Sequence, residues 1–250
     1  MEQTVLIDGD ITIYTSAIIG TETEEFFNGE TYKNEDLGVA IKAMRRELDY
    51  IIETTGADKF LVCLSAENNF RKYVSKEYKA NRKDKEKPKL IKPLRQWVMD
   101  NLPHRMLPVI EADDVMGIMA SDPDQREGMI VWSKDKDMKT VPCRLYDQKT
   151  NELLNISEEE ADRYWWTQTL TGDAVDGYKG IPGCGPAKAK KILDNDCSWS
   201  AVVEAYEAKG MTLDDAVRQA RMARILRHGD YDEKSFRVKL WKPDGYSEPT

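Results

Sequence analysis

The sequence predicts an α/β fold with a mostly parallel central sheet flanked by helices, followed by a smaller helical lobe. Short apolar runs, each the length of a buried strand, alternate with longer segments whose apolar residues recur at helical spacing. From about residue 160 the strand-like runs stop, and helical patterns continue to about residue 228. We therefore expect an α/β core in residues 1–160 and a helical lobe in residues 161–250 whose C-terminal end returns to the core.

Two apolar runs and one amphipathic segment predict the first half of the core. Residues 4–7 form a buried strand that ends in Asp8, and residues 60–64 form a second strand. Between them, a helix is predicted from about residue 34 to Gly56. Its apolar side chains recur at helical spacing, at Leu37, Ile41, Met44, Leu48 and Ile51.

The second half of the core continues the alternation. A helix is predicted to begin at Pro93, because proline suits the first turn of a helix. Strands are predicted at residues 106–110 and 129–132, with a helix over residues 111–119 between them. In a parallel sheet of this kind, ligands bind at the carboxyl ends of the strands.

The lobe is predicted to begin with a capped helix. Ser157 and Glu160 have the spacing of a capping box, and the helix that follows runs through Leu170. At the other end of the lobe, residues 235–241 alternate between apolar and polar side chains and are typical of an edge strand.

Charge is distributed unevenly along the chain. The 250 residues carry 37 Lys and Arg against 45 Asp and Glu, a net charge of −8. Residues 71–95 hold 11 basic and 3 acidic side chains, which gives 11 − 3 = +8 there and −16 elsewhere. A solvated helix face is the ordinary explanation of a charge run, but this one lacks acidic partners and interleaves aromatic rings with cations. We expect it to hold the phosphates of a nucleic acid strand.

Several classes of protein are excluded by composition. No apolar run approaches the ~18–20 residues that a membrane span needs. The four cysteines have no CxxC spacing, which argues against a disulfide framework and a zinc site. The N-terminus lacks the features of a signal peptide, so the expected location is the cytoplasm.

Acidic side chains recur where the predicted strands end or the helices begin. Each pair alone can complement a helix dipole or cap a turn. Together they would repel one another unless cations bind, and carboxylates are the ligands that Mg²⁺ prefers. The candidate metal ligands are Asp8, Glu111, Asp113, Asp114, Asp135, Asp137, Asp173 and Asp176.

A glycine-rich segment over residues 180–191 opens into a basic helix. An ordinary loop before such a helix is the alternative, but the Gly-x-Pro-Gly-x-Gly-Pro spacing is more specific than a pair of glycines. Glycines let backbone amides approach a phosphate, and a helix N-terminus adds positive potential. Gly183, Gly185 and Lys188 are therefore candidates for contact with a nucleic acid backbone.

The order of these motifs resembles the flap endonuclease and phage 5′ exonuclease family, and is most similar to the small coliphage exonucleases that degrade duplex DNA from 5′ ends. The motifs that match are residues 6–10, 69–72, 78–83, 111–114, 133–137, 172–176 and the glycine-rich segment. The resemblance implies a Mg²⁺-dependent 5′-3′ exonuclease of phage DNA replication and recombination, with flap cleavage and RNase H-like removal of RNA as further activities. It also implies a helical arch or gateway over residues 70–95 and a helix-three-turn-helix over residues 172–195.

The resemblance also implies roles for single residues. The acids matching Asp8, Glu111, Asp113 and Asp114 serve the more tightly bound of two Mg²⁺ ions, for which Mn²⁺ can substitute, and the acids matching Asp135, Asp137, Asp173 and Asp176 surround the second. Lys79 and Arg82 match residues that contact the scissile phosphate, and Tyr78 matches a base-stacking position. The strand-holding residues are expected to be Arg71, Lys72 and Lys83.

The implied partners are nucleic acids. They are duplex DNA with a 5′ end or a 5′ flap, and an RNA–DNA hybrid. A K⁺ ion is implied at the glycine-rich segment, no membrane partner is expected, and the chain is expected to be a monomer in the cytoplasm of the host if a phage encodes it.

One position departs from the family pattern. After the second strand the family places an aspartate that also supports the first metal, whereas this chain has Ser65 and Ala66 there. Glu67 is the acidic side chain nearest to that position and is a candidate substitute.

Two other functions fit part of the sequence. Residues 8–12 also match the DxDxT pattern of haloacid-dehalogenase-like phosphatases, with Asp8 as nucleophile and Asp10 as acid. That alternative leaves the basic stretch and the glycine-rich segment unexplained. The other alternative is a non-catalytic DNA-binding scaffold, which Ser65 and Ala66 favour.

Overall fold

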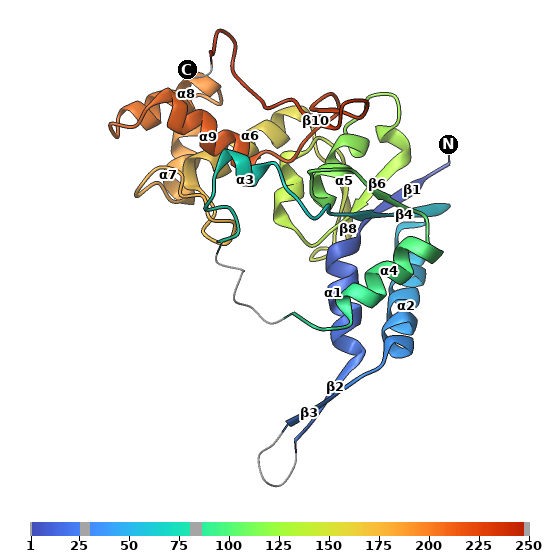
Figure 1. Cartoon of the computed structure of the whole chain (residues 1–250). Coiled ribbons are helices and arrows are strands. Elements are labelled where there is room, and N and C mark those ends of the chain that lie inside the picture. The colour runs from blue at the N-terminus through green and yellow to red at the C-terminus, as the bar shows by residue number, and fades with distance from the viewer. Residues whose placement is uncertain (1, 26–30, 81–86, 248–250) are drawn as a thin grey trace.

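The computed structural model describes residues 2–25, 31–80 and 87–247. In this part of the chain a six-stranded sheet forms the centre (Figure 1). Its strands, in spatial order, are β5 (His104–Met106), β4 (Lys59–Leu64), β1 (Thr4–Asp8), β6 (Met129–Trp132), β7 (Arg144–Asp147) and β8 (Glu152–Asn155). The pairs from β5 to β7 are parallel and the pair β7–β8 is antiparallel, so the predicted mostly parallel sheet is confirmed.

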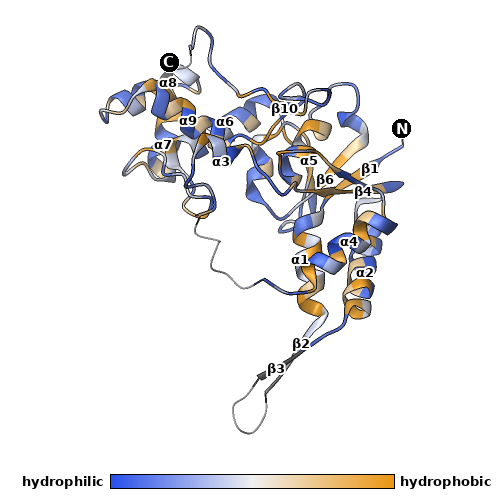
Figure 2. Ribbon diagram, viewed as in Figure 1, coloured by the Kyte–Doolittle hydropathy of each residue, from blue (hydrophilic) through white to orange (hydrophobic). Residues whose placement is uncertain are grey.

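One face of the sheet is covered by α1 (Gly9–Ile19), α2 (Leu37–Thr55) and α4 (Ile91–Asn101), as Figure 1 shows. Val5 and Ile7 of β1 point into this core because alternate residues of a strand face opposite sides. The end of α2 agrees with the prediction, since Gly56 follows it in the left-handed conformation with φ 63°. Figure 2 shows hydrophobic residues gathered along the central strands and the helices beside them.

The opposite face packs against α5 (Ala112–Ala120) and the short 3-10 helix η3 (Lys136–Thr140). Leu6 of β1 and Val131 of β6 lie in this second core, together with Leu226 from the C-terminal part of the chain. A further 3-10 helix, η2 (Arg126–Gly128), precedes β6. The first turn of α5 lies beside the carboxyl end of β4, because the N–H of Ala112 donates to Ser65 Oγ just after that strand.

The helices α6 (Glu158–Thr171), α7 (Pro186–Asn195), α8 (Trp199–Glu207) and α9 (Leu213–Ala223) enclose a third core. The predicted capping box is confirmed, because the side chain of Ser157 accepts from the Glu160 N–H and Glu160 accepts from the Ser157 N–H. Trp165, Trp166, Trp199 and Trp241 pack against one another beside this core, and Trp165 Nε1 donates to the carbonyl of Ala220 at 2.8 Å.

Several elements differ from the prediction. The hairpin β2 (Thr21–Glu25) and β3 (Thr31–Glu35), which extends beyond α1 and α2 in Figure 1, was not predicted because its alternating residues are polar on both faces. The predicted strand at residues 106–110 lies earlier as β5, since the next residues turn and Val109 has φ 60°. The tail does not join the central sheet: β9 (Tyr231–Asp232) and β10 (Arg237–Val238) pair only with each other.

The basic stretch is helical only at its two described ends. It begins with the four-residue helix α3 (Arg71–Val74) and reaches α4 after residues 81–86, which lie outside the described part of the chain. Arg82 and Lys83 fall in that undescribed range, so the structure does not place them. In the described ranges, no helix is both long enough and apolar enough to span a bilayer.

Candidate active site

Three acidic side chains lie together where the central strands end. Asp8 is the last residue of β1, Asp113 lies in the first turn of α5, and Asp135 follows β6. Asp8 is held at the N-terminus of α1, because its Oδ1 accepts from the N–H of Ile11 and its Oδ2 accepts from Ser133 Oγ, both at 3.1 Å. Parallel pairing of β1 with β6 brings these residues to one edge, as the sequence predicts.

Burial and the repulsion between neighbouring carboxylates favour the protonated forms of Asp8 and Asp113. Burial, with smaller effects of Asp10 and Asp135, raises the pKa of Asp8 to about 7. Burial and the charges of Asp8, Asp135 and Glu111 raise the pKa of Asp113 well above its usual value. Within the described residues, the buried Oδ1 of Asp113 has no hydrogen-bond partner. An unpaired buried carboxylate oxygen beside further carboxylates fits a divalent cation. A bound cation would offset the repulsion between the carboxylates and give the unpaired oxygen a ligand contact.

Glu111 precedes α5 and is held by two residues of the basic stretch. Its Oε1 accepts from Lys79 Nζ at 2.7 Å, and its Oε2 accepts from Tyr78 OH at 2.5 Å. Burial would raise the pKa of Glu111, but the charges of Lys79 and Arg71 outweigh it and lower the pKa to about 2. Lys79 thus lies beside Glu111, one of the predicted metal ligands.

Tyr78 does not lie where a stacking residue would. Its side chain is buried, with 4% exposed, and its hydroxyl faces Glu111. The ring also lies under the ammonium of Lys79, 4.9 Å from its centroid. In this arrangement Tyr78 orients Glu111, and the expectation that it stacks on a base is not supported by its position.

Asp114 and Arg71 form an internal pair instead of facing solvent. Asp114 is fully buried and accepts from both terminal nitrogens of Arg71 at 2.7 Å, as well as from the N–H groups of Glu111 and Leu226. Arg71, 3% exposed, also donates to the carbonyl of Arg224. The four bonds that Asp114 accepts leave no lone pair directed at a metal. The pair joins α3, α5 and the segment after α9, which corrects two expectations: Asp114 is not placed as a direct ligand, and Arg71 is not placed to hold DNA.

The second acidic group gathers around a lysine. Lys136 Nζ donates to Asp137 Oδ1 at 3.0 Å and to Asp173 Oδ2 at 2.6 Å. Burial, then the charge of Asp135, raises the pKa of Asp137. In Asp173 burial would raise the pKa, but the hydrogen bond and charge of Lys136, together with the N–H groups of Val175 and Asp176, outweigh burial and lower it. Lys136 thus bridges two residues that the family resemblance assigns to the second metal.

A tight turn brings Asp176 to the same edge. The N–H of Lys79 donates to the carbonyl of Asp176 at 2.9 Å, and Lys79 Nζ lies 3.9 Å from Asp176 Oδ2. The approach depends on Gly177, which has φ 82°, because a Cβ there would lie 2.4 Å from the carbonyl oxygen of Glu77. The loop before α7 is therefore fixed to the basic stretch by backbone contacts.

No metal cage is formed in advance. Among the described residues, no three His, Cys, Asp or Glu side chains lie close enough together to hold a metal ion. Four of the candidate ligands are held by lysine or arginine instead, namely Glu111, Asp114, Asp137 and Asp173. The protein's own cations neutralise part of the charge that the sequence assigns to metal ions. The sequence analysis identified neither the bridging role of Lys136 nor the pairing of Arg71 with Asp114. The position of Lys136 between Asp135 and Asp137 was a signal that could have indicated the first of these interactions.

Ser65 is part of a structural network at the position where the family places an aspartate. Ser65 Oγ accepts from the N–H of Ala112 at 2.9 Å, which fixes the start of α5. Its backbone N–H donates to Asp10, and its carbonyl accepts from Arg95, which also pairs with Asp10 at 2.8 Å. Glu67 is exposed. The sequence did not indicate this Asp10–Arg95 pair.

The glycine-rich segment presents open backbone at the start of α7. Gly183 has φ 72°, and a Cβ added at Gly183 or at Gly185 would meet no atom within 4 Å. Gly185 is the N-cap of α7, and Lys188 in its first turn is exposed, as is Lys72 in α3. An uncovered helix N-terminus with a nearby lysine suits a phosphate.

Comparison with known proteins agrees with this arrangement. The model of the 5′-3′ exonuclease N-terminal resolvase-like domain matches residues 3–164. The exonuclease of Escherichia phage T7 is 31% identical over 228 residues, which cover 75% of each chain. The exodeoxyribonuclease of Enterobacteria phage T3 is 30% identical over 227 residues, 75% of this chain and 74% of that one.

Solved structures show the same fold. The flap endonuclease of bacteriophage T5, solved in complex with DNA and metal ions, matches with a TM-score of 0.67 at 12% identity over 89% of both chains. The zinc-bound 5′-exonuclease of the same phage matches with a TM-score of 0.64 at 12% identity, over 89% of this chain and 93% of that one. The matched domain and the related phage exonucleases show the family, and the acids at the strand ends agree with it. The chain therefore belongs to the 5′-3′ exonuclease family.

Proposed function

We propose that this 5′-3′ exonuclease hydrolyses phosphodiester bonds of duplex DNA from 5′ ends with the help of two Mg²⁺ ions. The observation that carries the proposal is the group of Asp8, Asp113 and Asp135, in which the pKa values of Asp8 and Asp113 are raised and the Oδ1 of Asp113 has no partner within the described chain. Such a group is stabilised by a bound cation, and bound divalent cations promote the hydrolysis of phosphodiesters.

The proposed ligands form two sets. Asp8, Asp113 and Glu111 would hold the first ion, with Asp135 between the sets, while Asp137, Asp173 and Asp176 would hold the second. When bound, such a pair of ions supplies an activated water and stabilises charge on the attacking and leaving oxygens. The second set requires Lys136 to leave Asp137 and Asp173, because its ammonium now bridges them.

Lys79 is proposed to stabilise the scissile phosphate. Its ammonium lies between Glu111 and Asp176 and is a fifth exposed, so a phosphate that enters the site can reach it. A preorganised cation beside the reacting group needs little rearrangement during the reaction. Arg82 and Lys83 keep the roles that the sequence indicates, phosphate contact and strand holding, and lie outside the described residues.

The duplex is proposed to bind away from the acidic group. Lys188 and the amides around Gly183 and Gly185 would hold its backbone, with a K⁺ ion at the same turn, and Lys72 would hold the 5′ strand. Blunt or recessed 5′ ends, 5′ flaps and the RNA of an RNA–DNA hybrid are the proposed substrates, Mn²⁺ is a proposed substitute for Mg²⁺, and a monomer is the proposed active species.

The phosphatase alternative is not favoured by the site. It requires Asp10 as a free acid, but Asp10 is paired with Arg95 and accepts from the N–H of Ser65. In addition, the matched domain is an exonuclease domain and the related phage enzymes are exonucleases, not phosphatases.

Internally labelled duplexes with blunt, recessed or flapped 5′ ends, incubated in Mg²⁺ or in EDTA, test the proposal. We expect short 5′-derived products in Mg²⁺ alone, loss of these products with Asp135→Ala, and normal products with Asp124→Ala. Asp124 is the matched control because its side chain is exposed and it precedes β6, whereas Asp135 follows the carboxyl end of that strand. Intact DNA at high concentrations of the unaltered protein, or release of phosphate from p-nitrophenyl phosphate in place of DNA cleavage, would contradict the proposal.

A further inference from the structure

Helix α6 presents a buried glutamine to the second acidic group. Gln168 is 5% exposed, and its Nε2 donates to Asp137 Oδ1. The amide needs this orientation, because the opposite one would place its oxygen against a carboxylate oxygen. Lys136 Nζ donates to the same Oδ1 at 3.0 Å. One buried donor and one exposed donor therefore share this oxygen of Asp137.

The two donors differ in how freely they can move. The Lys136 side chain is 58% exposed, so its ammonium can turn into solvent when a cation approaches the aspartates. Gln168 is enclosed where α6 packs against η3. The backbone of Asp137 is fixed as well, because its N–H donates to Asp135 Oδ1 and its carbonyl accepts from Thr140 Oγ1, both at 2.8 Å. The amide of Gln168 can therefore keep its contact with Asp137 when Lys136 moves away.

The amide of Gln168 holds Asp137 at a cost to its own oxygen. Its Oε1 is buried and has no hydrogen-bond partner among the described residues. A buried polar atom without a partner is unfavourable, and an apolar side chain of similar length, such as methionine, would avoid that cost. Core packing by itself therefore does not explain a glutamine at this position, whereas the bond to Asp137 does.

Tyr178 shows a related pattern beside Asp173. The N–H of Asp173 donates to the carbonyl of Tyr178 at 2.8 Å, and the reverse bond is 3.0 Å long. The Tyr178 side chain is buried, and its hydroxyl has no hydrogen-bond partner within the described ranges. Burial, then the charges of Asp137, Asp173 and Asp176, raises the pKa of Tyr178. Buried polar atoms without described partners thus occur on residues bonded to Asp137 and to Asp173, the two acids that Lys136 bridges.

We propose that Gln168 is a positioning residue for the second cation and holds Asp137 ready to bind it after Lys136 has moved away. The inference rests on the proposed function, which assigns Asp137 and Asp173 to that cation. Hydrogen bonds to a ligating carboxylate fix its orientation and strengthen metal binding. Without Gln168, the side chain of Asp137 would be free to rotate once Lys136 leaves, and ordering it again would weaken the binding of the ion.

Calorimetric titration of the DNA-free protein with Mn²⁺ tests this role. Gln168→Met keeps the length of the side chain and removes the donor. Gln168→Asn keeps the amide but is one methylene shorter, so it does not reach Asp137 from the same backbone position. Asp137→Ala identifies the part of the Mn²⁺ titration that belongs to the second set of ligands.

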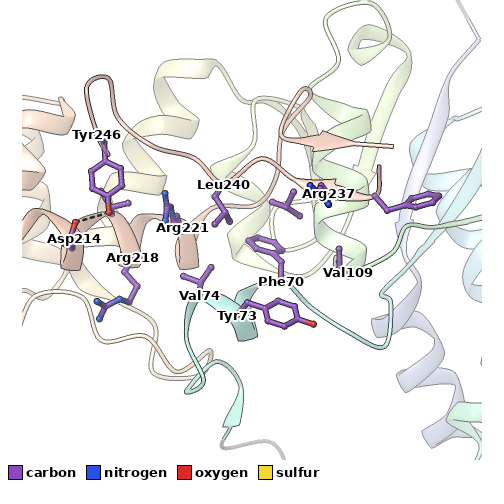
Figure 3. A pocket seen from close by; sticks show the side chains of 13 residues that line it. Phe70, Tyr73, Val74, Val109, Asp214, Arg218, Arg221, Arg237, Leu240 and Tyr246 are labelled. Atoms are coloured by element: carbon purple, nitrogen blue, oxygen red, sulfur yellow. Dashed lines mark hydrogen bonds between the residues drawn. The ribbon is translucent and has the colours of Figure 1, made fainter. Parts of the chain in front are cut away.

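Two control variants each remove one hydrogen bond to an aspartate elsewhere. Gln96→Met removes the bond from an exposed glutamine of α4 to Asp100, which is 2.8 Å long. Tyr246→Phe removes a partly buried bond, also of 2.8 Å, to Asp214. This second bond lies at a groove of about 550 Å³ between α3, α9 and the C-terminal tail, as Figure 3 shows.

Each Gln168 variant should weaken Mn²⁺ binding at the second set about tenfold or more, whereas both controls should leave it within about twofold. In the Lys136→Met background the loss caused by Gln168→Met should be larger, because neither donor then holds Asp137. Gln168→Met should leave the urea midpoint of unfolding unchanged or raise it, since it removes the unpaired oxygen. Cleavage by Gln168→Met should need more Mg²⁺ but recover its full rate at saturating Mg²⁺.

Mn²⁺ binding within about twofold of the unaltered protein in both Gln168 variants would overturn the inference. Equal weakening by a control would do the same, as would a loss of cleavage that excess Mg²⁺ does not restore. Failure of Gln168→Met to fold would also overturn it, because the amide would then serve the fold. If Asp137→Ala leaves Mn²⁺ binding unchanged, the assignment of Asp137 in the proposed function is wrong. If Asp137→Ala weakens it and the Gln168 variants do not, only the inference about Gln168 is wrong.

Discussion

Replacement of Arg71 by methionine tests whether this residue supports the fold or holds DNA. Methionine keeps most of the length of the side chain and removes the guanidinium. Asp114 would then lose two charge-assisted hydrogen bonds of 2.7 Å and would keep only the N–H groups of Glu111 and Leu226. The carbonyl of Arg224 would lose its donor as well.

The expected cost is large because both partners are buried. Only 4% of the Arg71 side chain and none of the Asp114 side chain are exposed, so water cannot replace the lost bonds without a change of structure. Two charge-assisted bonds at ~1.5–3 kcal/mol each give ~3–6 kcal/mol. Removal of one partner of a buried ion pair costs ~3–5 kcal/mol in other proteins, and a typical domain has only ~5–15 kcal/mol of stability.

Urea unfolding monitored by circular dichroism measures the effect. Arg71→Met should lower the free energy of unfolding by ~3–5 kcal/mol, while Lys72→Met, at the next and exposed position, should change it by less than ~0.5 kcal/mol. Adding Asp114→Asn to Arg71→Met removes the unpaired charge and should recover part of the loss, with a coupling energy of ~2 kcal/mol or more. Unchanged stability of Arg71→Met together with weaker DNA binding would refute the internal role of this side chain.

Three further predictions concern the acidic groups. Lys136→Met should tighten Mn²⁺ binding measured by calorimetry, because the ammonium no longer competes for its two carboxylates; unchanged or weaker binding would contradict this. In EDTA, the free energy of unfolding should fall by roughly 2–4 kcal/mol as pH rises from about 4 to 7. The reason is that Asp8 binds its proton more tightly in the folded state, where its pKa is about 7, than in the unfolded chain. Asp8→Asn or added Mg²⁺ should reduce this slope, and a stability that rises over the same range would show that the pKa is not raised. Gly177→Ala should lower the unfolding free energy by ~2–3 kcal/mol and slow cleavage, whereas Gly229→Ala, with φ 87° and open space, should cost only ~1 kcal/mol and leave cleavage unchanged.

Most of the core could be predicted because its signals are local. The apolar run before Asp8 becomes β1, Gly56 ends α2, and Ser157 with Glu160 begins α6. Each feature depends on residues within a few positions of one another. The β2–β3 hairpin was not predicted, because its strands are mostly polar at every position. They lack the alternation of apolar and polar residues that indicates a strand with one buried face.

The candidate site could be predicted only in part. Parallel strands end at one edge, so Asp8 and Asp135 come together, as their positions after predicted strands indicate. The state of each carboxylate was not predictable in the same way. Asp113 and Asp114 are neighbours in sequence, yet Asp113 has an unpartnered buried oxygen in the described chain and Asp114 pairs with Arg71.

The sequence by itself determined the alternation of the main core strands and helices, the position of the acids at strand ends and the resemblance to 5′ nucleases, because these depend on short-range patterns. Only the tertiary structure decided which cation meets which acid. Arg71 reaches Asp114 across 43 positions, Lys136 reaches Asp173 across 37, and the groove joins residues near 70 with the tail near 240. Such partners are chosen by packing between distant elements, and burial then decides whether a charge serves the fold or remains open to a ligand.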